Sequence, residues 1–180
     1  MKAMKLEDLL VLKLKALYDI ETSIVKALPK MIKAAGNEDL KEAFSGHLEE
    51  TKEHVARLER AFGELRMKPA KTKVEAIRGL IADTEWVIKN IAPQETLDAV
   101  LIASARYVEH YEMAGYLAAI GWAELLGENG VMEILADTLD EEEDAEEKLA
   151  SIAEDGVDEA ALGDSEGDEE GGEDDEEEDK

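Results

Sequence analysis

Cysteine is absent from this chain of 180 residues, and proline, phenylalanine and tryptophan are scarce, with 3, 2 and 2 copies. Without cysteine the chain has no disulfide, no thiolate metal ligand and no thiol nucleophile, although this leaves its redox compartment open. Few prolines, abundant helix formers and little alternation of β-branched residues predict an all-α protein. The chain is long enough to form one domain with a hydrophobic core.

Basic residues are also few. The chain has 20 Lys and Arg but 46 Asp and Glu, which gives a formal net charge of -26. A surface this acidic repels phosphate groups, and no basic patch with interleaved aromatic residues offsets it, so we expect no nucleic-acid partner. The acidity is greatest in residues 155–180, which hold 15 acids and one lysine. We expect this tail to be disordered, because it buries too little apolar surface to offset the entropy of ordering.

Long hydrophobic runs are missing as well. The run from Leu9 to Leu12 is too short to span a membrane. Glu7 and Asp8 stand where a signal peptide needs apolar residues. We therefore expect a cytoplasmic protein that does not bind a membrane.

Apolar residues at helical spacing predict helices over residues 6–35, 38–66, 73–90, 94–126 and 130–154. Gly36 is expected to end the first helix as a left-handed cap, Asn37 to cap the next helix, and Gly127 to end the helix over 94–126. Short connections at these glycines make two hairpins, whereas about 27 residues separate the hairpins. This is typical of a ferritin-like four-helix bundle with one long crossover that contains a short extra helix, here residues 1–154.

Three glutamates, Glu21, Glu112 and Glu142, interrupt the apolar stripes of these helices. Each lies 15 residues from its hairpin glycine, which is roughly 22 Å at about 1.5 Å per residue, so all three reach the same depth. Burying an unpaired carboxylate costs several kcal/mol, so these side chains should be paired, protonated or bound to a metal. Because about one residue in four is acidic, most other acids are explained by solvent-exposed helix faces.

Four further side chains are candidates to complete a metal site at this depth: Glu50, His54, Glu109 and Glu146. Glu50 and His54 lie four residues apart on the flank of one helix, where pairing with a surface lysine would also explain them. Glu109 is either a ligand or a supporting acid. We expect His47 to have a structural role and His110 to lie on the outside of the bundle.

Carboxylate oxygens with one or two imidazoles suit hard or borderline ions such as Fe(II) or Mn(II). Helical bundles hold two such ions with one Glu from each of two helices and a Glu plus a second ligand from each of the others. In this pattern the single ligands are Glu21 and Glu112, and the pairs are Glu50 with His54 and Glu142 with Glu146. We therefore expect two iron ions per bundle, with manganese as the alternative, that react with O2 or peroxide.

Four segments of the chain, taken together, resemble a known family; they are Ala27-Leu28-Pro29-Lys30-Met31, His47-Leu48-Glu49-Glu50-Thr51, Val108-Glu109-His110-Tyr111-Glu112 and Thr138-Leu139-Asp140-Glu141-Glu142. In order and spacing, over about residues 6–154, they are similar to the YciE/YciF family of ferritin-like stress proteins. The resemblance implies a helical bundle with a di-iron-type site, a homodimer and an association with stress responses. Ferritins carry Glu-x-x-His on the paired helices, and this chain departs from that pattern on both.

Two other functions stay open. The protein could bind metal without turnover and act as a stress-associated interaction protein, in which case bound iron is oxidised no faster than free iron. Alternatively, it could be a purely structural bundle whose buried acids pair with lysines or stay protonated. For a purely structural bundle we expect that added metal leaves the melting temperature unchanged.

Overall fold

The computed structural model describes residues 5–163, which form helices and no strand. In chain order the helices are α1 (Leu6–Ala34), α2 (Glu38–Glu64), α3 (Glu75–Asn90), α4 (Gln94–Leu126), α5 (Asn129–Ile152), η1 (Ala153–Val157) and α6 (Asp158–Ala160). The all-α prediction is confirmed, and the bounds of the five long helices agree with the sequence-based ranges to within about two residues. None of the described helices is long and apolar enough to cross a membrane.

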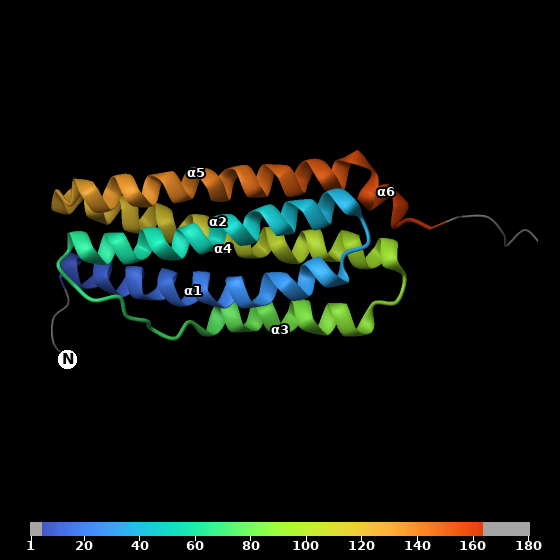
Figure 1. Cartoon of the computed structure of the whole chain (residues 1–180), viewed down its shortest axis with the longest axis horizontal. Coiled ribbons are helices and arrows are strands. Elements are labelled where there is room, and N and C mark those ends of the chain that lie inside the picture. The colour runs from blue at the N-terminus through green and yellow to red at the C-terminus, as the bar shows by residue number, and fades with distance from the viewer. Residues whose placement is uncertain (1–4, 164–180) are drawn as a thin grey trace, which may run out of the picture.

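Four long helices form the bundle, in which α1 and α5 each pack against both α2 and α4 (Figure 1). The crossover helix α3 lies on the outside, along α1 and α4. Large apolar side chains lie fully buried in the core; they include Leu10, Leu14, Leu17, Leu40, Phe44, Phe62 and Leu101. This is the predicted four-helix bundle with one long crossover.

The connection between α1 and α2 is held by a residue from another hairpin. The Asp98 carboxylate on α4 accepts hydrogen bonds from the backbone N–H groups of Gly36, at 2.7 Å, and Asn37, at 2.8 Å. The expected left-handed cap at Gly36 is wrong, because α1 ends at Ala34 and Gly36 has no positive φ. A side chain at Gly36 would collide with that of Gln94, so close approach explains the glycine.

Two other predicted helix ends are confirmed. Asn37 caps α2, since its side-chain oxygen accepts a hydrogen bond from the Leu40 N–H at 3.0 Å. Gly127 ends α4 in the left-handed conformation with a φ of 72°. The crossover is fixed separately by Asp19 of α1, which accepts bonds from the Val74 N–H at 3.0 Å and from Arg78 at 2.7 Å.

Helical structure continues past the predicted boundary at residue 154. The η1 and α6 segments extend it to Ala160, and Val157 is buried against the core. Gly156 makes the change of direction with a φ of 122°. The expectation of disorder is therefore wrong for residues 155–163, where burial of Val157 favours order, and residues 164–180 lie outside the described part of the chain.

Candidate metal centre

A cluster of six polar residues lies buried inside the bundle, each residue at most 7% exposed; it consists of Glu21, His47, His54, Glu109, Glu112 and Glu142. We call these six residues the buried cluster. Every helix of the bundle contributes to it: one residue each from α1 and α5 and two each from α2 and α4. Residues seven or three apart on a helix project from the same face, which is why α2 and α4 each supply two side chains.

The cluster contains two sets of three side chains whose ligand atoms lie within 4.8 Å of one another; they are Glu21, His54 and Glu142, and His47, Glu109 and Glu142. In the first set, His54 Nδ1 lies 3.2 Å from Glu142 Oε1 and 3.6 Å from Glu21 Oε2. In the second set, His47 Nε2 lies 3.4 Å from Glu109 Oε1 and 3.9 Å from Glu142 Oε2. Glu142 therefore presents one oxygen to each set.

The hydrogen-bonding capacity of the cluster is largely unused. Within residues 5–163, nine buried side-chain nitrogen and oxygen atoms have no hydrogen-bond partner, and all nine belong to the six cluster residues. Both oxygens of Glu112 and of Glu142 are among them. Buried polar groups in folded proteins are nearly always satisfied, so this concentration in one place is a set of oxygen and nitrogen donors that a bound cation would satisfy.

Burial also perturbs the acid–base chemistry of the cluster. It raises the pKa of the Glu112 carboxyl well above its usual range, and the neighbouring charges of Glu21 and Glu142 raise that pKa further. Burial lowers the pKa of His54, but the nearby carboxylates of Glu142 and Glu21 outweigh this and raise it to about 11. Burial likewise opposes protonation of His47, while Glu109 and Glu50 raise its pKa to about 9. In the absence of a metal, Glu112, His54 and His47 therefore bind protons more tightly than in an unfolded chain.

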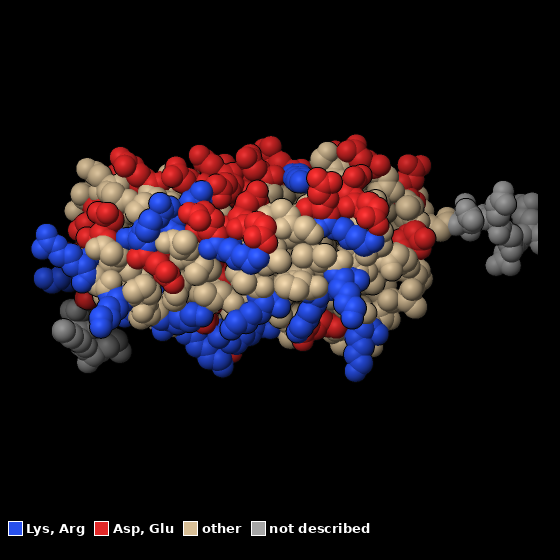
Figure 2. All heavy atoms as spheres, viewed as in Figure 1, with Lys and Arg blue, Asp and Glu red and all other residues tan. Residues whose placement is uncertain are grey.

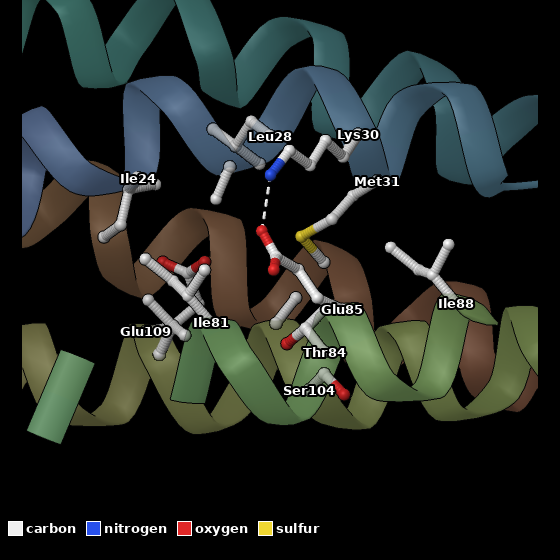
Figure 3. A pocket seen from close by; sticks show the side chains of 13 residues that line it. Ile24, Leu28, Lys30, Met31, Ile81, Thr84, Glu85, Ile88, Ser104 and Glu109 are labelled. Carbon is white, nitrogen blue, oxygen red and sulfur yellow. Dashed lines mark hydrogen bonds and ion pairs between the residues drawn. The ribbon is translucent and has the colours of Figure 1, made fainter. Parts of the chain in front are cut away.

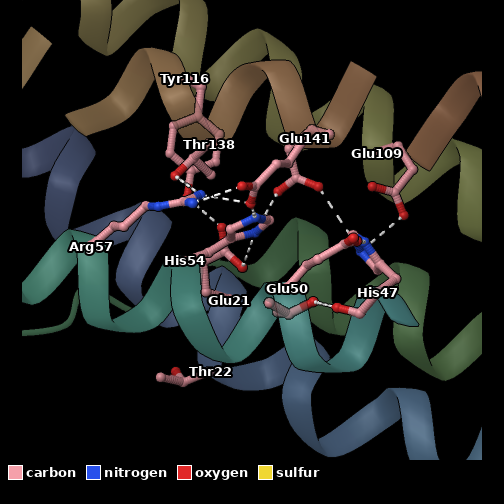
Figure 4. Close-up of polar contacts among 12 residues, drawn as sticks. Glu21, Thr22, His47, Glu50, His54, Arg57, Glu109, Tyr116, Thr138 and Glu141 are labelled. Carbon is pink, nitrogen blue, oxygen red and sulfur yellow. Dashed lines mark hydrogen bonds and ion pairs between the residues drawn. The ribbon is translucent and has the colours of Figure 1, made fainter. Parts of the chain in front are cut away.

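A second layer of contacts orients the ligands on the side of Glu21 and His54 (Figure 4). His54 Nε2 lies 2.9 Å from Glu141 Oε2, and Arg57 donates two bonds of 2.6 Å to the two oxygens of Glu141. The hydroxyl of the fully buried Tyr116 donates to Glu21 Oε1. Contacts of this kind fix the ring orientation and tautomer of a metal-binding histidine.

Comparison with known proteins agrees with this architecture. Residues 5–162 match the family described as "Domain of unknown function (DUF892)". The chain belongs to this family. It is 36% identical over 157 residues to Protein YciF of Escherichia coli strain K12, covering 87% of this chain and 95% of YciF. The predicted resemblance to the YciE/YciF family is thereby confirmed.

Solved structures of relatives share the fold. The crystal structure of the E. coli stress protein YciF matches with a TM-score of 0.83 at 35% identity, covering 87% of this chain and 99% of that chain. YcfI from Rhodopseudomonas palustris matches with a TM-score of 0.81 at 42% identity, covering 82% of this chain and 94% of that chain. The family match over residues 5–162 spans all four bundle helices and therefore every residue of the buried cluster.

Five of the seven metal ligands predicted for this DUF892 member lie together in the buried cluster; they are Glu21, His54, Glu109, Glu112 and Glu142. Glu50 lies at the edge instead, with its side chain 50% exposed and Oε2 3.7 Å from His47 Nδ1. Glu146 lies elsewhere, because Arg106 of α4 donates to it from Nε at 2.7 Å and from Nη2 at 2.6 Å.

His47, for which we expected a structural role, lies inside the buried cluster, and neither of its ring nitrogens has a hydrogen-bond partner. The spacing of seven residues between His47 and His54 places both on one helix face, and this spacing was the available signal. His110 is exterior as predicted, with 59% of its side chain exposed.

A small apolar cavity of about 30 Å³ approaches the cluster from the side of the crossover (Figure 3). It lies between α1, α3 and α4, and its lining includes Ile24, Leu28 and Ile81 together with Glu109 of the buried cluster. The ion pair of Lys30 with Glu85 lies across it. This space suits a small uncharged molecule better than a hydrated ion.

Proposed function

We propose that this protein is a ferritin-like di-metal carboxylate protein whose buried cluster binds two divalent ions, iron or manganese. The observation that carries the proposal is the confinement of all nine unsatisfied buried polar atoms of residues 5–163 to six side chains at one place. Oxygen donors with two imidazoles suit Fe(II) and Mn(II). Glu142, with one oxygen toward each set of side chains, is suited to be shared by the two ions.

The charge of the cluster supports two ions rather than one. Its four carboxylates carry four negative charges when ionised, and two divalent cations with neutral histidines balance this number. One ion set consists of Glu21, His54 and Glu142, and the other of His47, Glu109 and Glu142. Glu112, with both oxygens free of hydrogen bonds, supplies further oxygen ligands.

Bound iron or manganese would supply one-electron chemistry with O2 or peroxide. The protein's residues contribute in other ways. The four helices exclude bulk water from the six ligands, which are nearly inaccessible. Tyr116 holds a proton on its hydroxyl against Glu21, and the Glu141–Arg57 pair keeps the His54 ring in place. The protein would thus oxidise Fe(II) or consume peroxide, in keeping with the stress protein YciF to which it is similar, and would act in the cytoplasm.

A non-catalytic metal-binding or structural bundle is the second candidate function. One form of it requires lysines paired with the buried acids, yet the ion pairs of cluster acids in residues 5–163 involve only His47 and His54. The other form, with protonated acids, agrees with the raised pKa of Glu112, which burial and the neighbouring charges of Glu21 and Glu142 produce. Metal-dependent melting separates this form from the proposed function.

Aerobic oxidation of bound Fe(II) tests the catalytic part of the proposal. Metal-free protein is loaded with Fe(II) under anaerobic conditions and then mixed with air-saturated buffer while the absorbance of Fe(III) is followed. We expect oxidation at least about tenfold faster than for free Fe(II), a difference worth about 1.4 kcal/mol in the barrier. The Glu112→Ala variant should lose this acceleration. Oxidation at the rate of free iron by a protein that binds iron would identify a metal-binding protein without turnover.

A further inference from the structure

A second cavity, of about 110 Å³, opens between α2 and α5 beside the buried cluster. The exposed residues Glu50, Asp144 and Lys148 line its outer part, and His47 and Glu109 line its inner part. We propose that this cavity, called here the acidic vestibule, is the entrance by which divalent cations reach the cluster, with Glu50 and Asp144 as an outer cation site. The inference rests on the proposed function, because it requires the cluster to bind cations.

His47 connects the vestibule to the cluster. Its side chain is only 8% exposed, and neither ring nitrogen has a hydrogen-bond partner. Nδ1 faces Glu50 Oε2 at 3.7 Å, and Nε2 faces Glu109 Oε1 at 3.4 Å (Figure 4). A cation that leaves Glu50 therefore meets an unsatisfied nitrogen and then a buried carboxylate. Ligand exchange along this line never leaves the ion without protein donors, which avoids the large cost of a bare charge in the interior.

The other approaches to the cluster are unfavourable for cations. The cavity beside α3 is walled by apolar side chains, and the Lys30 ammonium lies across it. On the side of His54, Arg57 is bonded to both oxygens of Glu141 and places a positive charge next to the cluster. In the acidic vestibule the carboxylates of Glu50 and Asp144 outnumber the one ammonium group, that of Lys148, and the cluster residues His47 and Glu109 line the same cavity.

The charge of the surface around the vestibule also favours this route for cations over the other approaches to the cluster. In Figure 2 acidic side chains crowd the part of the surface over α5, whereas Lys and Arg gather along the opposite side, over α1 and α3. Clefts lined by one sign of charge raise the local concentration and association rate of oppositely charged ligands. Cations are therefore drawn toward the side on which the vestibule opens.

A charge reversal at the vestibule tests the inference through the kinetics of loading. Metal-free protein is mixed with Co(II) in a stopped-flow instrument, and the visible absorbance of bound Co(II) gives the rate and the final occupancy. Asp144→Lys should slow loading about tenfold at low ionic strength, with the difference shrinking as salt is added. Glu133→Lys is the matched control, since it makes the same charge change at an exposed position of α5 about three turns away. The final occupancy should be the same in all three proteins.

Obstruction of the vestibule provides a second variant that does not depend on charge. A Cβ atom added at Gly46 or at Gly63 of α2 meets no atom within 4 Å, but only Gly46 lines the vestibule. Gly46→Trp should slow loading at least about tenfold, whereas Gly63→Trp should load like the parent. Equal loading rates in the parent, Asp144→Lys and Gly46→Trp proteins would overturn the entrance while leaving the metal centre intact. A parent protein that takes up no Co(II) at equilibrium would instead overturn the proposed function and the entrance together.

Discussion

At the scale of single residues, the arrangement of the cluster depends on side chains that face in two directions. Glu142 presents one oxygen toward His54 and the other toward His47, and His47 lies between Glu50 and Glu109. Removing such a residue should therefore affect metal binding more than removing an acid that points away from the cluster. His47 of α2 and Glu146 of α5 provide the clearest contrast, since only His47 lies in the cluster.

We predict that His47→Leu lowers metal binding from two divalent ions per chain to one, because the His47–Glu109–Glu142 set loses its only imidazole. Glu146→Gln should still bind two, because Glu146 bonds to Arg106 outside the cluster. The number of Mn(II) ions bound per chain after equilibrium dialysis is measured for both variants. A loss of binding in Glu146→Gln equal to that in His47→Leu would show that the ions lie elsewhere.

The pKa shifts predict how pH affects the metal-free protein. Burial and the charges of Glu21 and Glu142 raise the pKa of Glu112, while the pKa values of His47 and His54 rise to about 9 and about 11 in spite of burial, through their carboxylate neighbours. All three groups bind protons more tightly when folded, so their contribution to stability falls as pH rises. For His47 it is complete below about pH 6.5 and lost by about pH 9.

The melting temperature of the metal-free protein should therefore drop by roughly 5 °C between pH 6 and pH 9. Saturating Mn(II) should abolish or reverse this trend, because the metal binds deprotonated ligands. Thermal scans followed by circular dichroism, with and without Mn(II), test this. An identical pH trend in the two states would contradict the assignment of the cluster as the metal site.

At the scale of helices and connections, residues distant in sequence fix the ends of the bundle elements. Asp98 of α4 holds the α1–α2 connection, and Asp19 of α1 holds the start of α3 through Val74 and Arg78. Both acids are buried and both accept backbone hydrogen bonds. They tie the crossover and the two hairpins into one structure.

Asp98→Ala should lower the free energy of unfolding by about 1–3 kcal/mol, because the N–H groups of Gly36 and Asn37 lose their acceptor. Glu95→Ala is the control, since Glu95 is exposed in the same first turns of α4 and should change stability by less than about 0.5 kcal/mol. Urea denaturation gives both values. Equal destabilisation by the two variants would mean that the Asp98 contact does not stabilise the connection.

Local patterns were sufficient to predict most of the fold. Apolar periodicity predicted the five long helices, and the caps at Asn37 and Gly127 depend on residues adjacent in sequence. Contacts between helices could not be predicted from local sequence patterns. The Asp98 bond to Gly36 and the bond from Arg106 to Glu146 join residues 40 or more positions apart. The spacing of His47 and His54 could be read from the sequence, but the position of His47 beside Glu109 and Glu142 depends on how α2 is rotated in the bundle.

At the scale of the whole molecule, charge and apolar surface are unevenly distributed. Acidic side chains are concentrated over α5 and basic ones over α1 and α3 (Figure 2).

Helix α4 exposes three large apolar side chains, those of Tyr107, Leu117 and Leu125, whose exposed fractions are 64%, 55% and 77%. The homodimer expected from the sequence stays a prediction, and this apolar face of α4 is where we propose that the two chains meet. Sedimentation should give a dimer for the parent and a monomer for Leu117→Glu.

The central claim is that the buried cluster binds two divalent ions, and an anaerobic equilibrium titration with Fe(II) tests it most directly. Bound iron is counted in the parent and in Glu142→Leu, which removes the residue shared by both sets of ligands. We expect about two ions per chain in the parent and loss of both in the variant, whose metal-free form stays folded because an apolar side chain replaces a buried acid. Equal iron binding by the two proteins would place the ions on the acidic exterior and rule out the buried cluster as the metal site.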